Sequence, residues 1–136
     1  SKSGRIVLSV SAFVPKPFTP FQWHPMAAEQ VIVKRLKILR DGLKKENVKV
    51  HHDQLKNAYT EGLLAMGDRR IALVIESMAD GLSWRKACEA HSTDPAHYIF
   101  REKSFEEPLP WDFIENGVNK EGLWREYTLS VAAHSG

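Results

Sequence analysis

Residues 5–14 read Arg-Ile-Val-Leu-Ser-Val-Ser-Ala-Phe-Val, and this stretch decides the fold class. Its β-branched and other apolar residues recur at every second position, which predicts a β-strand. Beyond the first residue neither face of the strand carries a charge, and such strands are typical of parallel sheets covered on both sides. The only other candidate strand is the short segment 48–51. Because so few strands leave many backbone groups unpaired, the pattern indicates part of a larger sheet.

The segment that follows, residues 15–25, reads Pro-Lys-Pro-Phe-Thr-Pro-Phe-Gln-Trp-His-Pro. Its prolines exclude a helix and predict a stiff, ordered loop. In parallel β/α barrels, the segments that leave the carboxyl ends of the strands form the active-site face. The loop therefore offers groups to a substrate, either as polar contacts or as apolar and stacking surfaces: Lys16, Thr19 and Gln22, and Phe18, Phe21 and Trp23. The alternative for the aromatic residues is that they only fill the mouth of the barrel.

The rest of the chain predicts a succession of helices. Amphipathic patterns run over residues 27–45, 53–66, 68–80, 83–91, 94–100 and 120–132. Residues suited to capping precede four of these helices: Asp53, Asp68, Ser83 and Asp94. We therefore expect an α+β fold that is mainly α. Residues 1–25 would hold the first strand and its substrate-side loop, and residues 26–136 would form a helical C-terminal extension with at most one further strand.

Composition and net charge limit the classes of partner that can be expected for the chain. The chain has 136 residues and 43% hydrophobic content, enough for one folded domain. Its 19 Lys and Arg are interspersed with 17 Asp and Glu, and a net charge of +2 gives no reason to expect nucleic acid or an anionic membrane as partner. Without an apolar run of about 20 residues or the apolar core of a signal peptide, we expect a cytoplasmic protein.

Metal binding is not indicated by the Cys and His residues. Cys88 is the single cysteine and falls in a helical pattern with Trp84 and Ala87, so we expect it to be buried. His51 and His52 are adjacent in a short strand and would point to opposite faces. Any metal centre is therefore expected to lie outside this chain.

Two arginines, Arg69 and Arg70, stand in the first turn of a predicted helix, where the helix dipole disfavours cations. A guanidinium group can hold a carboxylate or a phosphate through two parallel hydrogen bonds. The pair is therefore predicted either to anchor an anionic substrate or to form salt bridges with nearby acids.

Residues 81–88, Gly-Leu-Ser-Trp-Arg-Lys-Ala-Cys, are followed by Asp-Pro-Ala-His-Tyr at 94–98. With these stretches, residues 78–101 resemble a helix-turn-helix of the small phage terminase type. A nucleic-acid or protein-binding module in residues 68–103 is therefore the alternative function. The helix after Asp94 would enter the major groove. It displays Ile99 and Phe100 and is followed by only Arg101 and Lys103 as cations, which makes nucleic-acid binding the weaker expectation.

A longer likeness covers most of the chain. Residues 9–23, Ser-Val-Ser-Ala-Phe-Val-Pro-Lys-Pro-Phe-Thr-Pro-Phe-Gln-Trp, resemble the last barrel strand and following loop of bacterial radical S-adenosylmethionine proteins with a cobalamin-binding-like N-terminal domain. The resemblance continues in the Met-Gly-Asp-Arg-Arg of residues 66–70 and in residues 98–114, 117–118 and 120–121. Residues 81–93 are shorter than the corresponding segment of many relatives.

The resemblance implies a parent enzyme whose partial barrel binds a [4Fe-4S] cluster through three cysteines and cleaves S-adenosylmethionine to a radical, with cobalamin as a possible further cofactor. Those cysteines are not in this chain, so no cofactor site is complete here, no catalytic residue is expected and the chain should be inactive alone. Residues 1–25 would then hold the last strand of this partial β/α barrel and its substrate-side loop, and the implied partner is the remainder of the barrel. The substrate class stays open between RNA, a protein side chain and a small anionic metabolite.

The same resemblance assigns roles to individual residues. The implied cofactor-binding residues, near the adenosine, are Ser11, Phe13 and Val14. The chemistry of the loop and of the arginine pair supplies the candidate substrate-binding residues: Lys16, Phe18, Thr19, Phe21, Trp23, Arg69 and Arg70.

Overall fold

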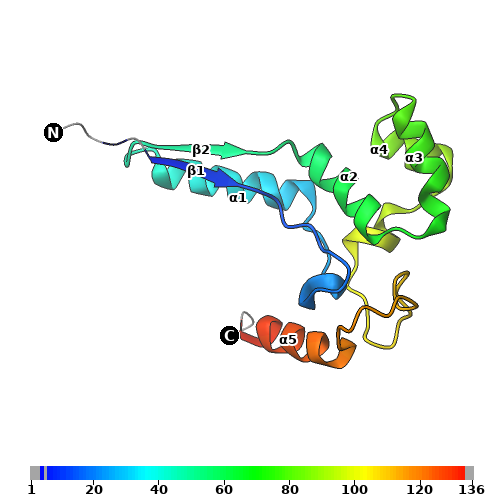
Figure 1. Ribbon diagram of the computed structural model, residues 1–136. Coiled ribbons are helices and arrows are strands. Elements are labelled where there is room, and N and C mark those ends of the chain that lie inside the picture. Colours follow the sequence, from blue (N-terminus) through cyan, green and yellow to red (C-terminus); the bar gives the residue numbers. More distant parts are fainter. Residues whose placement is uncertain (1–3, 5, 134–136) are drawn as a thin grey trace.

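A computed structural model describes residues 4 and 6–133 of the chain. In chain order the elements are β1 (Ile6–Val10), η1 (Pro20–Trp23), α1 (Glu29–Leu43), β2 (Val48–His52), α2 (Leu55–Met66), η2 (Arg69–Ile71), α3 (Ala72–Ala79), α4 (Trp84–Ala90), η3 (Ala96–Phe100) and α5 (Lys120–Ala133). The fold is α+β and mainly α, as predicted (Figure 1). Arg5, the predicted start of the first strand, lies outside the described residues.

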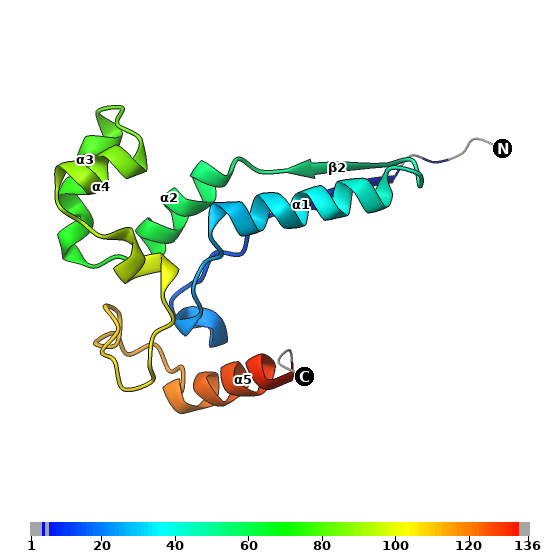
Figure 2. The same ribbon diagram turned by 180° about the vertical axis from the view of Figure 1, so that it is seen from behind.

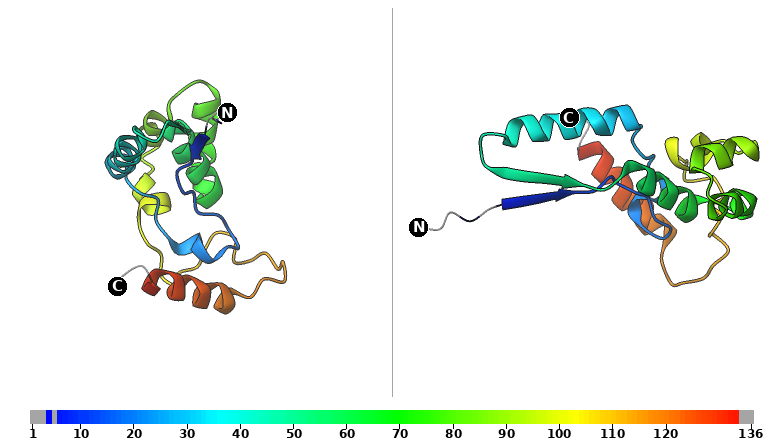
Figure 3. Two further views of the ribbon diagram at one scale, coloured as in Figure 1. Left: turned by 90° about the vertical axis from the view of Figure 1, so that its left-hand side faces the viewer. Right: turned by 90° about the horizontal axis from the view of Figure 1, so that it is seen from above.

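The first strand, the first long helix and the second strand form a β-α-β arm. β1 pairs with β2 in parallel, with Ile6 opposite Val48 and Val10 opposite His52. α1 connects them and lies along one face of the pair (Figures 1 and 2). The arm extends away from α2, α3 and α4, so the molecule is elongated (Figure 3). The predicted second strand is confirmed, and its parallel direction follows from the helix that returns the chain between the strands.

The predicted extent of the first strand is wrong. β1 ends at Val10 rather than at Val14, because β2 provides a partner over only five residues. β2 follows β1 in the chain and is its parallel neighbour in the sheet.

The arm exposes much of its apolar surface. Ile6 and Val7, on opposite faces of β1, are 65% and 52% exposed. In α1 only Leu36 is buried, whereas Val33 and Ile38 are exposed. The expected covering on both faces of the first strand is absent within the described residues, because α1 alone packs against the sheet.

The hydrophobic core lies where the proline-rich loop meets the C-terminal half of the chain. Met26 N donates to Ile99 O over 2.7 Å, and Lys103 N donates to Trp23 O over 3.0 Å. α5 packs against η1, and the rings of Trp23 and Trp124 meet edge to face with centroids 5.0 Å apart. These contacts hold the loop in one conformation, as its prolines predict.

Most of the local helix signals are confirmed. The side chains of Asp68, Ser83 and Asp94 accept hydrogen bonds from the backbone N–H groups of Arg70, Lys86 and Ala96. Asp53 is not the cap of α2, since Gln54 occupies that position. The helix predicted at 68–80 divides into η2 and α3, and the one predicted at 94–100 is the single wide turn η3.

Among the described residues, no helix is both long and apolar enough to cross a bilayer.

Candidate functional site

A polar pocket lies at the carboxyl ends of β1 and β2. It has a volume of about 350 Å³ and is lined by Ser11, Ala12, Val14, Lys16, Asp53, Leu55, Asn57, Ala58 and Glu61. Parallel strands end at the same edge of a sheet, so the segment leaving β1 and the start of α2 meet there. This strand-end pocket occupies the position at which open α/β sheets and β/α barrels bind their ligands.

Two polar pairs shape the strand-end pocket. Ser11 Oγ donates a 2.8 Å hydrogen bond to Asp53 Oδ2, and Lys16 Nζ forms a salt bridge with the carboxylate of Glu61. Both pairs are exposed to solvent. Exposed pairs contribute at most about 1 kcal/mol, so a ligand can replace either partner at little cost.

The chemistry of the pocket follows from these groups. The carboxylates of Asp53 and Glu61 accept hydrogen bonds from hydroxyl or ammonium groups, and Lys16 and Ser11 supply donors. Ala12, Val14 and Leu55 add apolar contacts. The arrangement suits a ligand that combines hydroxyl and ammonium groups with an apolar portion.

The implied cofactor-binding residues divide between two places. Ser11 and Val14 line the strand-end pocket. Phe13 does not, because its ring packs edge to face against Phe21 and His24, with centroids 5.8 Å apart in both cases. The structure therefore brings together two of these three residues.

The loop residues also divide. Lys16 faces the strand-end pocket, and Thr19 Oγ1 donates to the Lys16 carbonyl over 2.8 Å, which fixes the turn. Phe18, with a φ of 59°, lines a separate cavity, and Phe21 packs on Tyr127.

Trp23 is the clearest departure from the expected substrate contacts. It is 0% exposed and packs against Phe105, Trp124 and Tyr127. Its Nε1 has no hydrogen-bond partner among the described residues. In this arrangement Trp23 belongs to the core, which favours a packing role for this residue over the expected substrate contact.

Gln22 also has a structural role instead of the expected substrate contact. Its buried Oε1 accepts from Phe18 N over 3.0 Å and from Trp111 Nε1 over 2.7 Å. This amide joins the loop to a residue 89 positions later in the chain. The sequence shows a glutamine in the loop, but nothing local identifies its indole partner.

The two arginines lie apart from the strand-end pocket. The guanidinium group of Arg70 binds the carboxylate of Asp68 through hydrogen bonds. Nε and Nη2 donate to Oδ2 over 2.9 Å and 2.6 Å. This guanidinium, helped by Tyr98 Oη, which donates to Oδ1, lowers the pKa of Asp68 to about 2. Arg70 lines another cavity, with His91 and His97, whereas Arg69 is exposed on η2. The salt-bridge interpretation therefore holds for Arg70.

Asp53, Asn57 and Glu61 are the pocket residues that sequence reasoning missed. An acidic residue directly after a second strand was the available signal, but its capping motif suggested a local role. Its partner Ser11 lies 42 residues earlier and becomes apparent only when the strands are aligned in parallel.

Within the described residues no group of three His, Cys, Asp or Glu is placed to hold a metal ion, and Cys88 is buried.

Comparison of the chain with protein-family models, with curated proteins and with solved structures found no match.

Proposed function

We propose that this chain contributes a substrate-facing loop and a helical extension to a radical S-adenosylmethionine enzyme, and that it has no activity alone. The observation that carries the proposal is the strand-end pocket. It lies at the carboxyl edge of two parallel strands, where a β/α barrel binds its ligands, and it contains Ser11, Val14 and Lys16 of the segment that resembles this family.

The free edge of β1 supports the remainder of a barrel as the partner. Within the described residues β1 pairs only with β2, and its Ile6, Val7 and Leu8 remain exposed. Full burial of one such side chain contributes about 1.5–3 kcal/mol. A neighbouring parallel strand and a covering layer would therefore stabilise the arm considerably.

The cofactors of this family differ in how well the residues of this chain could bind them. A [4Fe-4S] cluster needs several thiolates, and the chain offers only the buried Cys88, so the cluster would be held by another part of the parent protein. We assign no residue here to cobalamin.

S-adenosylmethionine is the cofactor that the strand-end pocket suits. It would supply the organic radical once one electron from the reduced cluster of the parent protein cleaves it. Asp53 and Ser11 would bind its hydroxyl groups, Glu61 its ammonium group, and Val14 an apolar portion.

The test compares this chain with a longer parent protein after both are loaded anaerobically with iron and sulfide and supplied with S-adenosylmethionine and the one-electron reductant dithionite. We expect 5′-deoxyadenosine from the parent and none from this chain. Iron and sulfide content, measured in parallel, separates a failure of loading from a failure of chemistry. Cleavage by this chain alone, or no cleavage by a fully loaded parent, would overturn the proposal.

The alternative of a helix-turn-helix module gains no support. The segment that would enter the major groove is the five-residue turn η3, and its Tyr98 and Ile99 are buried. Lys103 is buried as well. A groove-reading helix needs exposed side chains, so these residues do not favour this function.

A further inference from the structure

The charges of the chain are segregated, although its net charge is only +2. Residues 29–52, from α1 through β2, contain seven Lys and Arg against three Asp and Glu, a net charge of +4. Residues 53–133 contain nine against fourteen, a net charge of −5. The cations of the arm are Lys34, Arg35, Lys37, Arg40, Lys44, Lys45 and Lys49. Such an asymmetry within one chain is a sign of an anionic partner.

The cations of the arm also differ from the others in their pairing. In the acidic part of the chain Arg70, Arg101 and Lys120 each form a salt bridge with a carboxylate. None of the seven cations of the arm does so among the described residues, and Glu29 pairs instead with Arg85 of α4. Like charges three or four residues apart on a helix destabilise it by about 0.2–0.5 kcal/mol per pair. An anion bound beside them would remove this repulsion.

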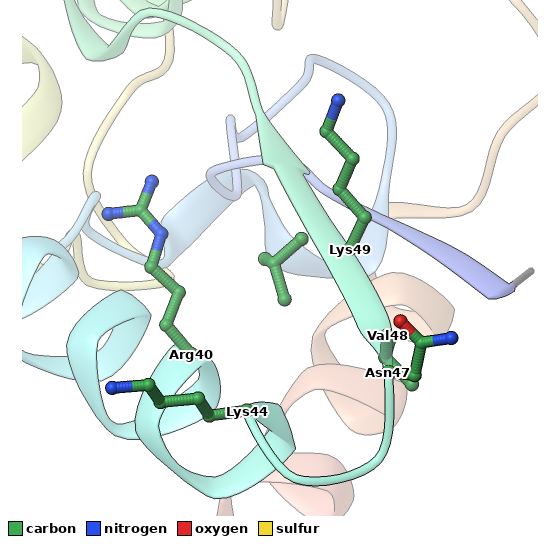
Figure 4. Close-up of a pocket in the computed structure, with 6 residues that line it drawn as sticks. Arg40, Lys44, Asn47, Val48 and Lys49 are labelled. Carbon is green, nitrogen blue, oxygen red and sulfur yellow. The ribbon is translucent and has the colours of Figure 1, made fainter.

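Part of this charge borders a groove between α1 and β2. The groove has a volume of about 440 Å³ and is lined by Arg40, Lys44, Asn47, Val48, Lys49 and Val50. Figure 4 shows Arg40 and Lys44 projecting from the helix and Lys49 from the strand. Within the part of the chain that the structure describes, no acidic residue lines this basic groove. It lies at the amino end of β2, the opposite end of the strand from the strand-end pocket.

The spacing of the cations indicates the class of anion. Lys37, Arg40 and Lys44 follow one another at intervals of three and four residues along one side of α1. At 1.5 Å per residue this row is about 10 Å long. One strand of a duplex carries a phosphate about every 3.4 Å along its axis, so the row spans about three phosphates. The row extends well beyond one phosphate group, so it suits a ligand that presents several phosphates in a line.

The lack of aromatic residues limits what can be recognised. Residues 29–52 contain no Phe, Tyr or Trp, so this surface offers no aromatic platform for stacking unpaired bases. We propose that the basic groove and the adjoining row bind the phosphate backbone of a double-stranded nucleic acid without sequence preference. This inference does not depend on the proposed function.

Fluorescence anisotropy of the full chain with a short labelled DNA duplex tests the inference. Neutralisation of about three phosphates predicts that the association constant falls about 20- to 50-fold between about 50 and 200 mM salt. In the double variant R40Q/K44Q we expect at least about 10-fold weaker binding at the lowest salt and a shallower salt dependence.

The control is K86Q/R125Q, which removes two exposed cations from the acidic part of the chain and changes the net charge equally. It should bind as the unmodified chain does, and circular dichroism should give the same helix content for both double variants. Three results would overturn the inference: no salt-dependent binding, an equal loss in the control, or competition by inorganic pyrophosphate at the same phosphate concentration. Tighter binding to phosphatidylserine vesicles than to the duplex would assign the groove to a membrane surface and would also overturn it.

Discussion

Ser11 and Asp53 join the carboxyl ends of the two parallel strands, through a 2.8 Å hydrogen bond from Ser11 Oγ to Asp53 Oδ2. Ser11 directly follows β1 and Asp53 directly follows β2. One carboxylate therefore ties the two strand ends together and, with its remaining lone pairs, faces the strand-end pocket.

We expect D53N to weaken binding of S-adenosylmethionine by the proposed parent enzyme about 10-fold. Hydrogen bonds to a charged group contribute about 1.5–3 kcal/mol, and the neutral amide retains an acceptor for Ser11 but loses that charge. Isothermal titration with the cluster-loaded enzyme measures the dissociation constant. D80N, at the exposed end of α3, is the matched control and should leave affinity unchanged. Equal affinities of D53N and the unmodified enzyme would remove Asp53 from the site.

We expect Q22L to lower the free energy of unfolding by about 2–3 kcal/mol. The substitution leaves the buried Trp111 Nε1 and the backbone N–H of Phe18 without their acceptor, and each orphaned donor costs about 1–3 kcal/mol. Urea denaturation measures the change, with the exposed Q30L as control. The double variant Q22L/W111F should be less destabilised than the sum of the single variants, because the indole donor is then absent. Additive losses would contradict this account.

Glycines 42 and 67 should respond in opposite directions to alanine. A Cβ at Gly67 would lie 2.6 Å from Leu63 O and would overlap the side chain of Ile71, so G67A should cost about 1–3 kcal/mol. A Cβ at Gly42, near the end of α1, meets nothing within 4 Å, so G42A should stabilise the chain by about 0.5–1 kcal/mol. The melting temperatures of both variants, measured by thermal unfolding, test this prediction. A higher melting temperature for G67A than for G42A would be incompatible with the packing around Gly67.

The features that could be predicted from the sequence depend on residues that are close together in the chain. Alternating apolar residues identify β1, prolines identify the ordered loop, and the caps at Asp68 and Ser83 need partners only two or three residues away. The features that the sequence did not reveal depend on contacts between residues that lie far apart in the chain. Trp23 is buried because Trp124 and Tyr127 of α5 cover it, about 100 residues later.

The same distinction applies to charge. The net charge of +2 predicted no polyanionic partner, because summation over the whole chain conceals two regions of opposite sign. Only the placement of α1 beside β2 brings Arg40, Lys44 and Lys49 to one groove. Sequence analysis can reveal the asymmetry when charge is counted by segment, but the groove itself depends on the packing of the helix against the strand.

Lys103 provides a prediction for alkaline pH. Its Nζ is buried and donates to Tyr98 O over 2.7 Å. Burial, reinforced by the nearby Arg101, lowers the pKa of Lys103 from 10.5 to about 8 in the folded chain. Between these values the unfolded chain binds more protons at this residue than the folded chain does. The contribution of Lys103 to the free energy of unfolding should therefore rise by about 1 kcal/mol from about pH 8 to about pH 9.

Other groups oppose this trend, so the measurement must isolate Lys103. Burial raises the pKa values of Cys88 and Tyr59, and both groups lower stability as the pH rises further. We therefore expect the effect in the difference between the unmodified chain and K103M, measured by urea denaturation at about pH 7, 8 and 9. The difference should shift in favour of the unmodified chain as the pH rises, whereas that for K86M, at an exposed lysine, should stay constant. A constant difference for K103M would mean that folding does not change the proton affinity of Lys103.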